Sequence, residues 1–170
     1  MGRIRIELVP STMWGKSLAG LARSDPSWGS KWKAIRQREL SRTGGRCDIC
    51  GSNGFIVHEK WDYGEKGLVQ RLNGFEVTCE NCSLVHHIGR ASVTGQEERA
   101  LDHLKKVNGL TDEEANTLVE KAFSTWNWRS QLKWNIELTW LKMRRADYGL
   151  SEKDVDEAEV LLRSLEWRGR

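Results

Sequence analysis

The sequence of 170 residues predicts an α+β fold, and three observations support this class. Apolar and polar residues alternate over residues 4–8 and 133–141, which is the period of a half-buried strand. Longer segments instead repeat apolar residues at helical spacing. These segments are residues 25–43, 96–107, 111–126 and 151–165. Four cysteines in two closely spaced pairs lie between the basic first helix and the helical C-terminal part, so they are expected to hold a small central core together.

The expected organisation has three regions. An N-terminal strand and basic helix occupy residues 1–46, a central core with the cysteines occupies residues 47–90, and a mainly helical extension with one strand near 133–141 occupies residues 91–170. The strand at 133–141 is expected to pair with the N-terminal strand, because neither segment has another obvious partner.

Capping residues set the expected ends of the helices. Asp25 followed by Pro26 predicts the start of the first helix, and Gly44-Gly45 predicts its end. Thr111, with a glutamate three residues later, forms a capping-box pattern. Ser151 is expected to cap the last helix.

Composition and charge restrict the class of protein. The sequence is 38% hydrophobic and 30% charged, as in globular proteins that bury a modest core. It has no apolar run of membrane-spanning length and no secretory signal, so we expect a cytoplasmic protein without a membrane partner. The formal net charge is +3, but residues 1–46 hold ten Lys and Arg against three Asp and Glu. This basic N-terminal region is compatible with contacts to phosphate groups, and it is equally compatible with a helix whose basic face is simply exposed to solvent.

The cysteine spacing predicts a structural zinc site. Cys47 and Cys50 form one C-x-x-C pair, Cys79 and Cys82 form another, and 28 residues separate the pairs. Each pair can form a tight knuckle that offers two thiolates to one tetrahedral zinc ion. The alternative is four free thiols or two disulfides. It is less expected, because no cysteine is left over and reduced cysteines of a cytosolic protein bind a metal ion more often than one another.

The motifs around the cysteines resemble those of the HNH endonucleases, the ββα-metal or His-Me finger nucleases in their zinc-stabilised form. The resemblance covers residues 43–90, with C-D-I-C-G, then V-H-E on an expected strand, L-N-G-F-E-V-T-C-E-N-C, and H-H on an expected helix. The flanks R-I-E-L-V-P, H-E-K-W-D-Y and V-H-H-I-G-R-A also look like small bacterial proteins labelled as HNH endonucleases. The resemblance implies a zinc-stabilised ββα-metal core, treble-clef-like, that hydrolyses phosphodiester bonds in DNA with Mg²⁺ or another divalent ion.

The resemblance also implies roles for individual residues. His58 falls on the position of a metal ligand and Glu59 on that of the general base. In the alternative assignment His58 is the base, and Glu59 and His87 hold the ion. His87 matches a ligand on the helix, and Asn73 matches the middle asparagine that orients the base. Ser83 stands where the family supplies another ligand.

The remaining candidate residues are two other histidines, Glu59 in a second role, and the basic helix. His86 is expected to be a substitute metal ligand or a phosphate contact. Glu59, if it is not a catalytic carboxylate, is expected to be an ordinary charged residue on the exposed surface of the strand. His103 lies far from the motif and is expected to be an incidental surface residue. The expected contacts to the DNA backbone lie on the basic helix: Lys31, Arg36, Arg38 and Arg42.

Other functions and assemblies stay open at this point. The departures at Glu59 and Ser83 favour, as an alternative, a catalytically decayed zinc-stabilised module that binds nucleic acid or protein. A third possibility is a subunit of a larger phage or defence assembly that takes its specificity from partners, which the absence of a separate recognition domain within these 170 residues favours. A homodimer or a larger nucleoprotein assembly would decide whether one strand or both strands are cut.

Overall fold

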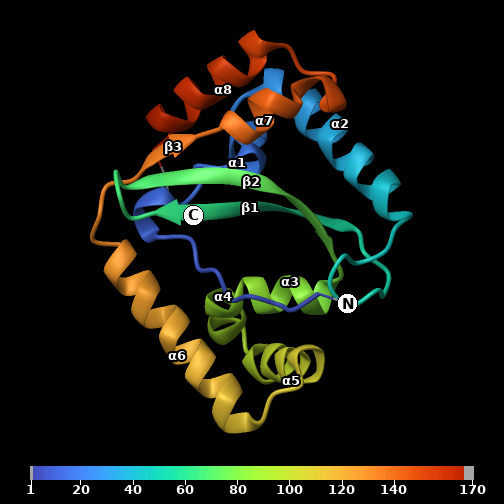
Figure 1. Cartoon of the computed structure of the whole chain (residues 1–170), viewed down its shortest axis with the longest axis vertical. Coiled ribbons are helices and arrows are strands. Elements are labelled where there is room, and N and C mark those ends of the chain that lie inside the picture. Colours follow the sequence, from blue (N-terminus) through green and yellow to red (C-terminus); the bar gives the residue numbers. More distant parts are fainter. Residues whose placement is uncertain (1, 167–170) are drawn as a thin grey trace.

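The computed structural model describes residues 2–166 and confirms the α+β class. A small sheet crosses the middle of the molecule, one group of helices lies on one side of it, and a second group lies on the other (Figure 1). The strands are β1 (Ile56–Gly64), β2 (Val69–Thr78) and β3 (Asn135–Glu137). The α-helices are α1 (Leu18–Ser24), α2 (Pro26–Thr43), α3 (Glu80–His86), α4 (Ile88–Val93), α5 (Glu97–Asn108), α6 (Asp112–Arg129), α7 (Thr139–Arg144) and α8 (Glu152–Ser164). Short 3₁₀ turns are η1 (Ser11–Met13) and η2 (Arg145–Tyr148).

The sheet has the order β1-β2-β3. β1 and β2 form an antiparallel hairpin in which His58 pairs with Glu76, and the register shifts between Lys60 and Trp61. β3 adds a short parallel pairing to β2. The two cysteine pairs flank this hairpin, and α3 follows β2 directly, so strand, strand and helix are consecutive in the chain.

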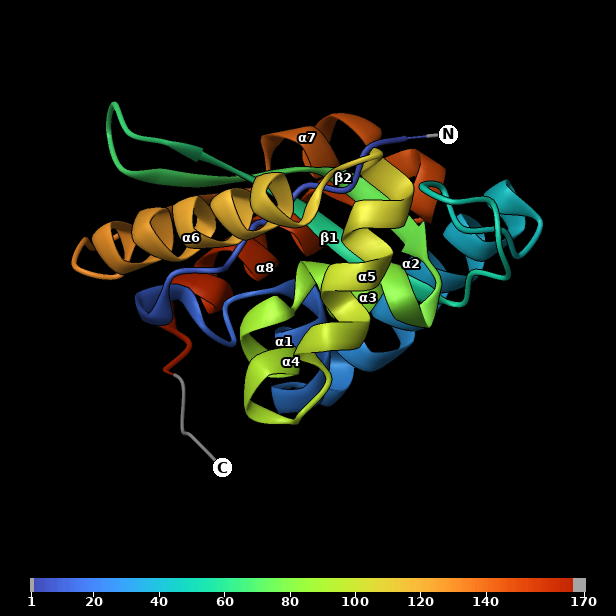
Figure 2. The same ribbon diagram turned by 90° about the horizontal axis from the view of Figure 1, so that it is seen from below.

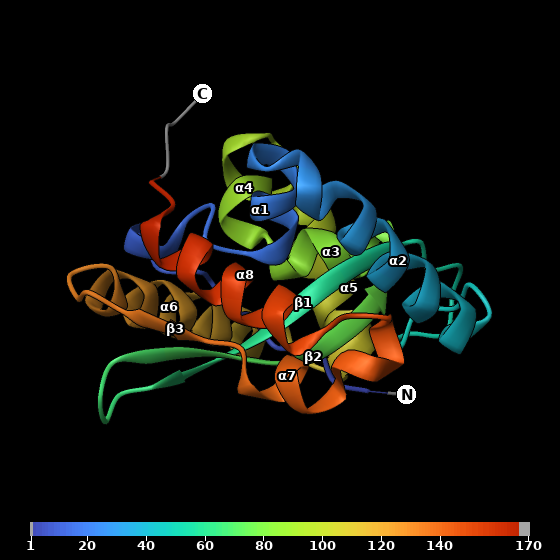
Figure 3. The same ribbon diagram turned by 90° about the horizontal axis from the view of Figure 1, so that it is seen from above.

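Helices α1, α2, α7 and α8 cover one side of the sheet (Figure 3). Their core is built from large side chains such as Trp28, Ile35, Leu141 and Leu162, which pack with sheet residues including Trp61. The start and end of α2 agree with the prediction, because the Asp25 side chain accepts from the Ser27 N–H and Gly44 ends the helix in a left-handed conformation with φ of 59°.

Helices α3 to α6 lie on the other side (Figure 2). A second, smaller core there joins the cysteines to Val85, Ile88, Ala100 and Leu104. The capping box predicted at Thr111 is present at the start of α6, and Ser151 caps α8 as predicted, there also in a capping box, with Asp154. The helix predicted over residues 96–107 is confirmed as α5.

Both edge-strand predictions need correction. Residues 2–10 form no strand, because the side chain of Asn108 satisfies the backbone of Ile4 in place of a partner strand: it accepts from the Ile4 N–H and donates to the Ile4 carbonyl, both at 2.9 Å. The segment near 133–141 forms only the three residues of β3 and pairs with β2. The pairing stops at Leu138, whose N–H donates to the Glu159 carboxylate, and α7 begins at the next residue.

None of the described helices is both long enough and apolar enough to cross a membrane.

Candidate functional site

The four cysteines converge on one point, and the cluster can hold a metal ion such as zinc. Their sulfur atoms all lie within 4.8 Å of one another. Cys47 Sγ is 3.7 Å from Cys82 Sγ, and Cys50 Sγ is 3.6 Å from Cys79 Sγ. Zinc–sulfur bonds of about 2.3 Å in a tetrahedron place the sulfurs about 3.8 Å apart, so the donor set fits zinc. A disulfide requires about 2.05 Å, and the four thiols are free.

The chain is tightly folded around the first cysteine pair, Cys47 and Cys50, which we call the first knuckle. Gly54 lies so close to the knuckle that a Cβ atom there would stand 2.6 Å from the backbone nitrogen of Cys47, which only glycine avoids. Asp48 connects the knuckle to its surroundings. Its carboxylate accepts from the Val77 N–H at 2.8 Å and from two guanidinium nitrogens of Arg42 at 3.0 and 2.6 Å.

His103 lies against the cysteine cluster, so the prediction that it is an incidental surface residue was wrong. Its Nε2 atom is 3.1 Å from Cys82 Sγ, although the two residues are 21 positions apart. Burial raises the pKa of the Cys82 thiol well above its usual range. A metal ion and an imidazole N–H donor are the kinds of partner that stabilise such a buried sulfur as a thiolate.

Three histidines form a second cluster beside the first. The His58 ring on β1 is 4.8 Å from the His87 ring and 5.0 Å from the His86 ring, measured between centroids. The His58 Nε2 atom also lies 3.0 Å from the hydroxyl of Ser83 on α3. Glu76, opposite His58 in the sheet, accepts a hydrogen bond of 3.0 Å from His86 Nε2. The structure therefore brings His58, His87 and Ser83 together as expected and adds Glu76 to them.

Two of these histidines are neutral at neutral pH. Burial, with smaller contributions from His86 and His87, lowers the pKa of His58 from 6.5 to about 3. Burial also lowers the pKa of His87, and His86 and Arg90 act in the same direction. A neutral imidazole has a free nitrogen lone pair, so each ring can bind a divalent ion or accept a proton.

The structure does not place Glu59 with the histidines. Successive residues of a strand point to opposite faces, and the Glu59 carboxylate lies on the far face from His58. It accepts the N–H groups of Leu18 and Ala19, at 2.8 and 2.9 Å, in the first turn of α1. Burial raises its pKa to about 7. Glu59 thus holds α1 against the sheet.

Asn73 also lies apart from the histidines. Its side-chain amide donates to the Asp62 carboxylate at 2.7 Å.

Most of the predicted basic face is engaged with carboxylates of the protein itself. Lys31 lies 3.2 Å from Asp154, and Arg38 lies 3.8 Å from Asp147. Arg42 pairs with Asp48 and with Glu39, the latter at 2.7 Å. Of the four predicted residues, Arg36 alone has no ion pair within residues 2–166.

Within the same described residues, the four cysteines are the one group of three or more His, Cys, Asp or Glu side chains that converges closely enough for a metal ion. The three histidines are near one another, but their nitrogen atoms do not meet at a single point.

Sequence reasoning missed Glu76 and His103. Glu76 alternates with buried residues on β2 and gives no motif signal, but the pairing of the two strands places it opposite His58. The contact of His103 depends on the packing of α5 against α3, which no local pattern in the sequence encodes.

Comparison with protein-family models, with curated proteins and with solved structures finds no match to this chain.

Proposed function

We propose that this protein is a metal-dependent endonuclease of the HNH type that hydrolyses phosphodiester bonds in DNA. The observation that carries the proposal is the pair of neutral imidazoles of His58 and His87, 4.8 Å apart, on a hairpin and helix anchored by the four cysteines. The consecutive order of β1, β2 and α3 agrees with the ββα core that the sequence motifs imply.

The residues of this cluster can divide the required tasks. A divalent ion such as Mg²⁺ supplies charge neutralisation at the scissile phosphate and at the leaving oxygen. His87, at the end of α3, is the ligand we assign to that ion. His58 either shares the ion or accepts the proton of the attacking water. Its lowered pKa keeps the ring neutral, as both roles require, but also makes it a weak base. Ser83 lies within hydrogen-bond distance of His58 Nε2 and orients that ring.

Glu76 and His86 support the cluster from one side. Their mutual hydrogen bond fixes the His86 ring 5.0 Å from His58. We therefore assign His86 a positioning or phosphate-contact role. Glu59 and Asn73 have no part in the proposed chemistry, because their side chains are bound elsewhere.

A second candidate function is a zinc-stabilised nucleic-acid- or protein-binding module that has lost hydrolysis, as a component of a phage or defence assembly. The specific observation in its favour is that the histidine nitrogens do not converge on one point, while the Nε2 atom of His58 lies 3.0 Å from the hydroxyl of Ser83, a poor metal ligand.

The two functions are separated by cleavage of supercoiled plasmid and of short single-stranded DNA. The purified, zinc-containing protein is incubated with Mg²⁺, Mn²⁺ or Ni²⁺, beside His58→Ala and His87→Ala. Glu120→Ala, at an exposed position on α6, is the control variant. We expect metal-dependent nicking in the wild type and the control, and its loss in both histidine variants at unchanged zinc content.

Cutting that persists in both histidine variants would be assigned to a contaminant and would refute the site. No cutting with any ion, by protein that carries one zinc per chain and still binds DNA, would establish the binding module instead.

A further inference from the structure

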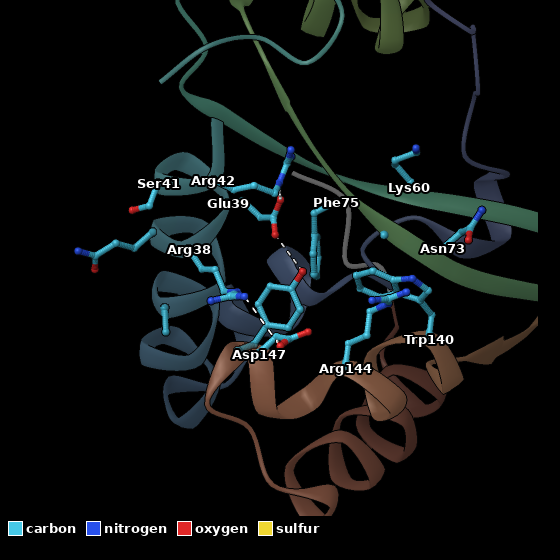
Figure 4. Close-up of a pocket in the computed structure, with 14 residues that line it drawn as sticks. Arg38, Glu39, Ser41, Arg42, Lys60, Asn73, Phe75, Trp140, Arg144 and Asp147 are labelled. Atoms are coloured by element: carbon cyan, nitrogen blue, oxygen red, sulfur yellow. Dashed lines mark hydrogen bonds and ion pairs between the residues drawn. The ribbon is translucent and has the colours of Figure 1, made fainter. Parts of the chain in front are cut away.

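A cavity of about 900 Å³ opens between α2, the sheet and α7 (Figure 4). It is bordered by one face of α2, by Gly74 and Phe75 of β2, and by the α7–η2 segment. None of the three clustered histidines lines it. Its volume falls within the range of small-molecule and cofactor sites, about 300–1,000 Å³.

Aromatic rings form one wall of this cavity. Phe75, Trp140 and Tyr148 pack together, with centroid separations of 5.7, 5.4 and 6.3 Å for the three pairs. Phe75 is buried, whereas Trp140 and Tyr148 are partly exposed and line the opening. The Trp140 ring lies against the backbone of Gly74, where a Cβ atom would stand 3.6 Å from it, an ordinary contact distance.

The lining is cationic, with four Lys and Arg against two acidic residues. The acidic Glu39 is satisfied within the protein, because Arg42 and the Tyr148 hydroxyl both donate to it. Arg144 and Lys60 have no ion pair with any described residue, and the Arg144 guanidinium lies 5.3 Å from the centre of the Trp140 ring. Two cations without an ion pair among the described residues thus line the same cavity as two partly exposed aromatic rings.

We propose that this cavity binds a nucleotide unit of single-stranded nucleic acid. The base stacks on Trp140 and Tyr148, and the phosphate pairs with Arg144 and Lys60. Aromatic platforms combined with cations are the general means of binding unpaired strands, because every base has a stacking face and every nucleotide a phosphate. In a duplex the bases are already stacked and paired, so a duplex fits this cavity poorly.

The cavity also indicates the substrate class of the proposed nuclease, and this part of the inference rests on the proposed function. Lys60 follows His58 by two residues in β1, about 7 Å along the strand, before the register shift. A strand held at Lys60 therefore passes close to the histidine cluster. The cut is expected in unpaired DNA.

The test is fluorescence anisotropy with a labelled 12-nucleotide oligo-dT, a duplex of the same length and free dTMP as competitor. It is run without added divalent ion, so binding is measured apart from cleavage. The variants are Trp140→Leu and Arg144→Glu. Lys121→Glu is the matched control, because it makes the same charge reversal at an exposed position on α6 without an ion pair among the described residues.

We expect the oligonucleotide to bind more tightly than the duplex. Trp140→Leu should weaken binding about five- to 100-fold, the range for loss of one stacking platform. Arg144→Glu should weaken it about tenfold or more at low salt and reduce its salt dependence, whereas Lys121→Glu should change it less than about threefold.

Wild-type affinity in Trp140→Leu and Arg144→Glu would overturn the proposal, as would an equal loss in Lys121→Glu or a preference for the duplex. Competition by dTMP as strong as by the oligonucleotide would overturn the assignment to a strand in favour of a free nucleotide. Binding that behaves as expected in a protein that cuts nothing would refute the nuclease and leave the cavity assignment standing.

Discussion

Replacing Arg42 by alanine tests whether this predicted DNA contact is instead part of the framework. Its guanidinium donates to Glu39 at 2.7 Å and to both oxygens of Asp48, at 3.0 and 2.6 Å. The Glu39 side chain is only 5% exposed, so Arg42→Ala leaves a buried carboxylate with the Tyr148 hydroxyl as its remaining donor among the described residues.

The expected cost follows from this burial. Removing one partner of a fully buried ion pair costs about 3–5 kcal/mol. The Arg42 side chain is 47% exposed, and water screens part of the interaction, so we expect a loss of about 2–3 kcal/mol in the free energy of unfolding.

Arg38→Ala is the matched control, one helical turn earlier on α2. Arg38 pairs with Asp147 at 3.8 Å, and both side chains are about half exposed, at 54% and 53%. An exposed pair of this kind and a cation–π contact with Tyr148 together contribute about 1 kcal/mol or less. Both substitutions shorten an arginine to alanine in the same helix, so their difference isolates the buried partner.

Urea unfolding followed by tryptophan fluorescence measures both variants, since the chain contains nine tryptophans. Arg42→Ala should lower the midpoint by about 1 M urea relative to the wild type. The double variant Glu39→Gln/Arg42→Ala should recover at least half of the loss, because the buried charge is gone. Equal costs for Arg42→Ala and Arg38→Ala, or no recovery in the double variant, would refute this reasoning.

Three further predictions concern the sites. His103→Ala should weaken zinc binding about 10- to 100-fold in competition with a chromophoric chelator, through loss of the hydrogen bond to Cys82; unchanged affinity would make that contact incidental. Glu59→Ala should destabilise the protein by about 2 kcal/mol, because two amides at the start of α1 lose their buried acceptor, yet it should leave metal binding intact. Weakened metal binding would restore Glu59 to the site. Ser83→His should raise divalent-ion affinity and any nicking activity, because the new imidazole would stand next to His58; calorimetry with Mn²⁺ that shows no gain would contradict a shared ion at this place.

The sequence by itself determined the features that depend on local patterns. Cysteine pairs at knuckle spacing, Asp25-Pro26 before an apolar helix, and the capping residues Thr111 and Ser151 act through residues only a few positions away. The helix caps therefore form with little influence from the rest of the chain, whereas the cluster of four cysteines also needs the β1–β2 hairpin to bring the two pairs together.

The tertiary structure decided what each polar side chain contacts. Glu59 is adjacent to His58 in sequence, but alternation along β1 sends it to the opposite face and to α1. Arg42 lies on a basic helix, but folding brings Asp48 and Glu39 within its reach. His103 meets Cys82 only because α5 packs on α3. In each case the partner is chosen by packing between distant segments, because hydrogen bonds and ion pairs act over a few ångströms in space and not along the chain.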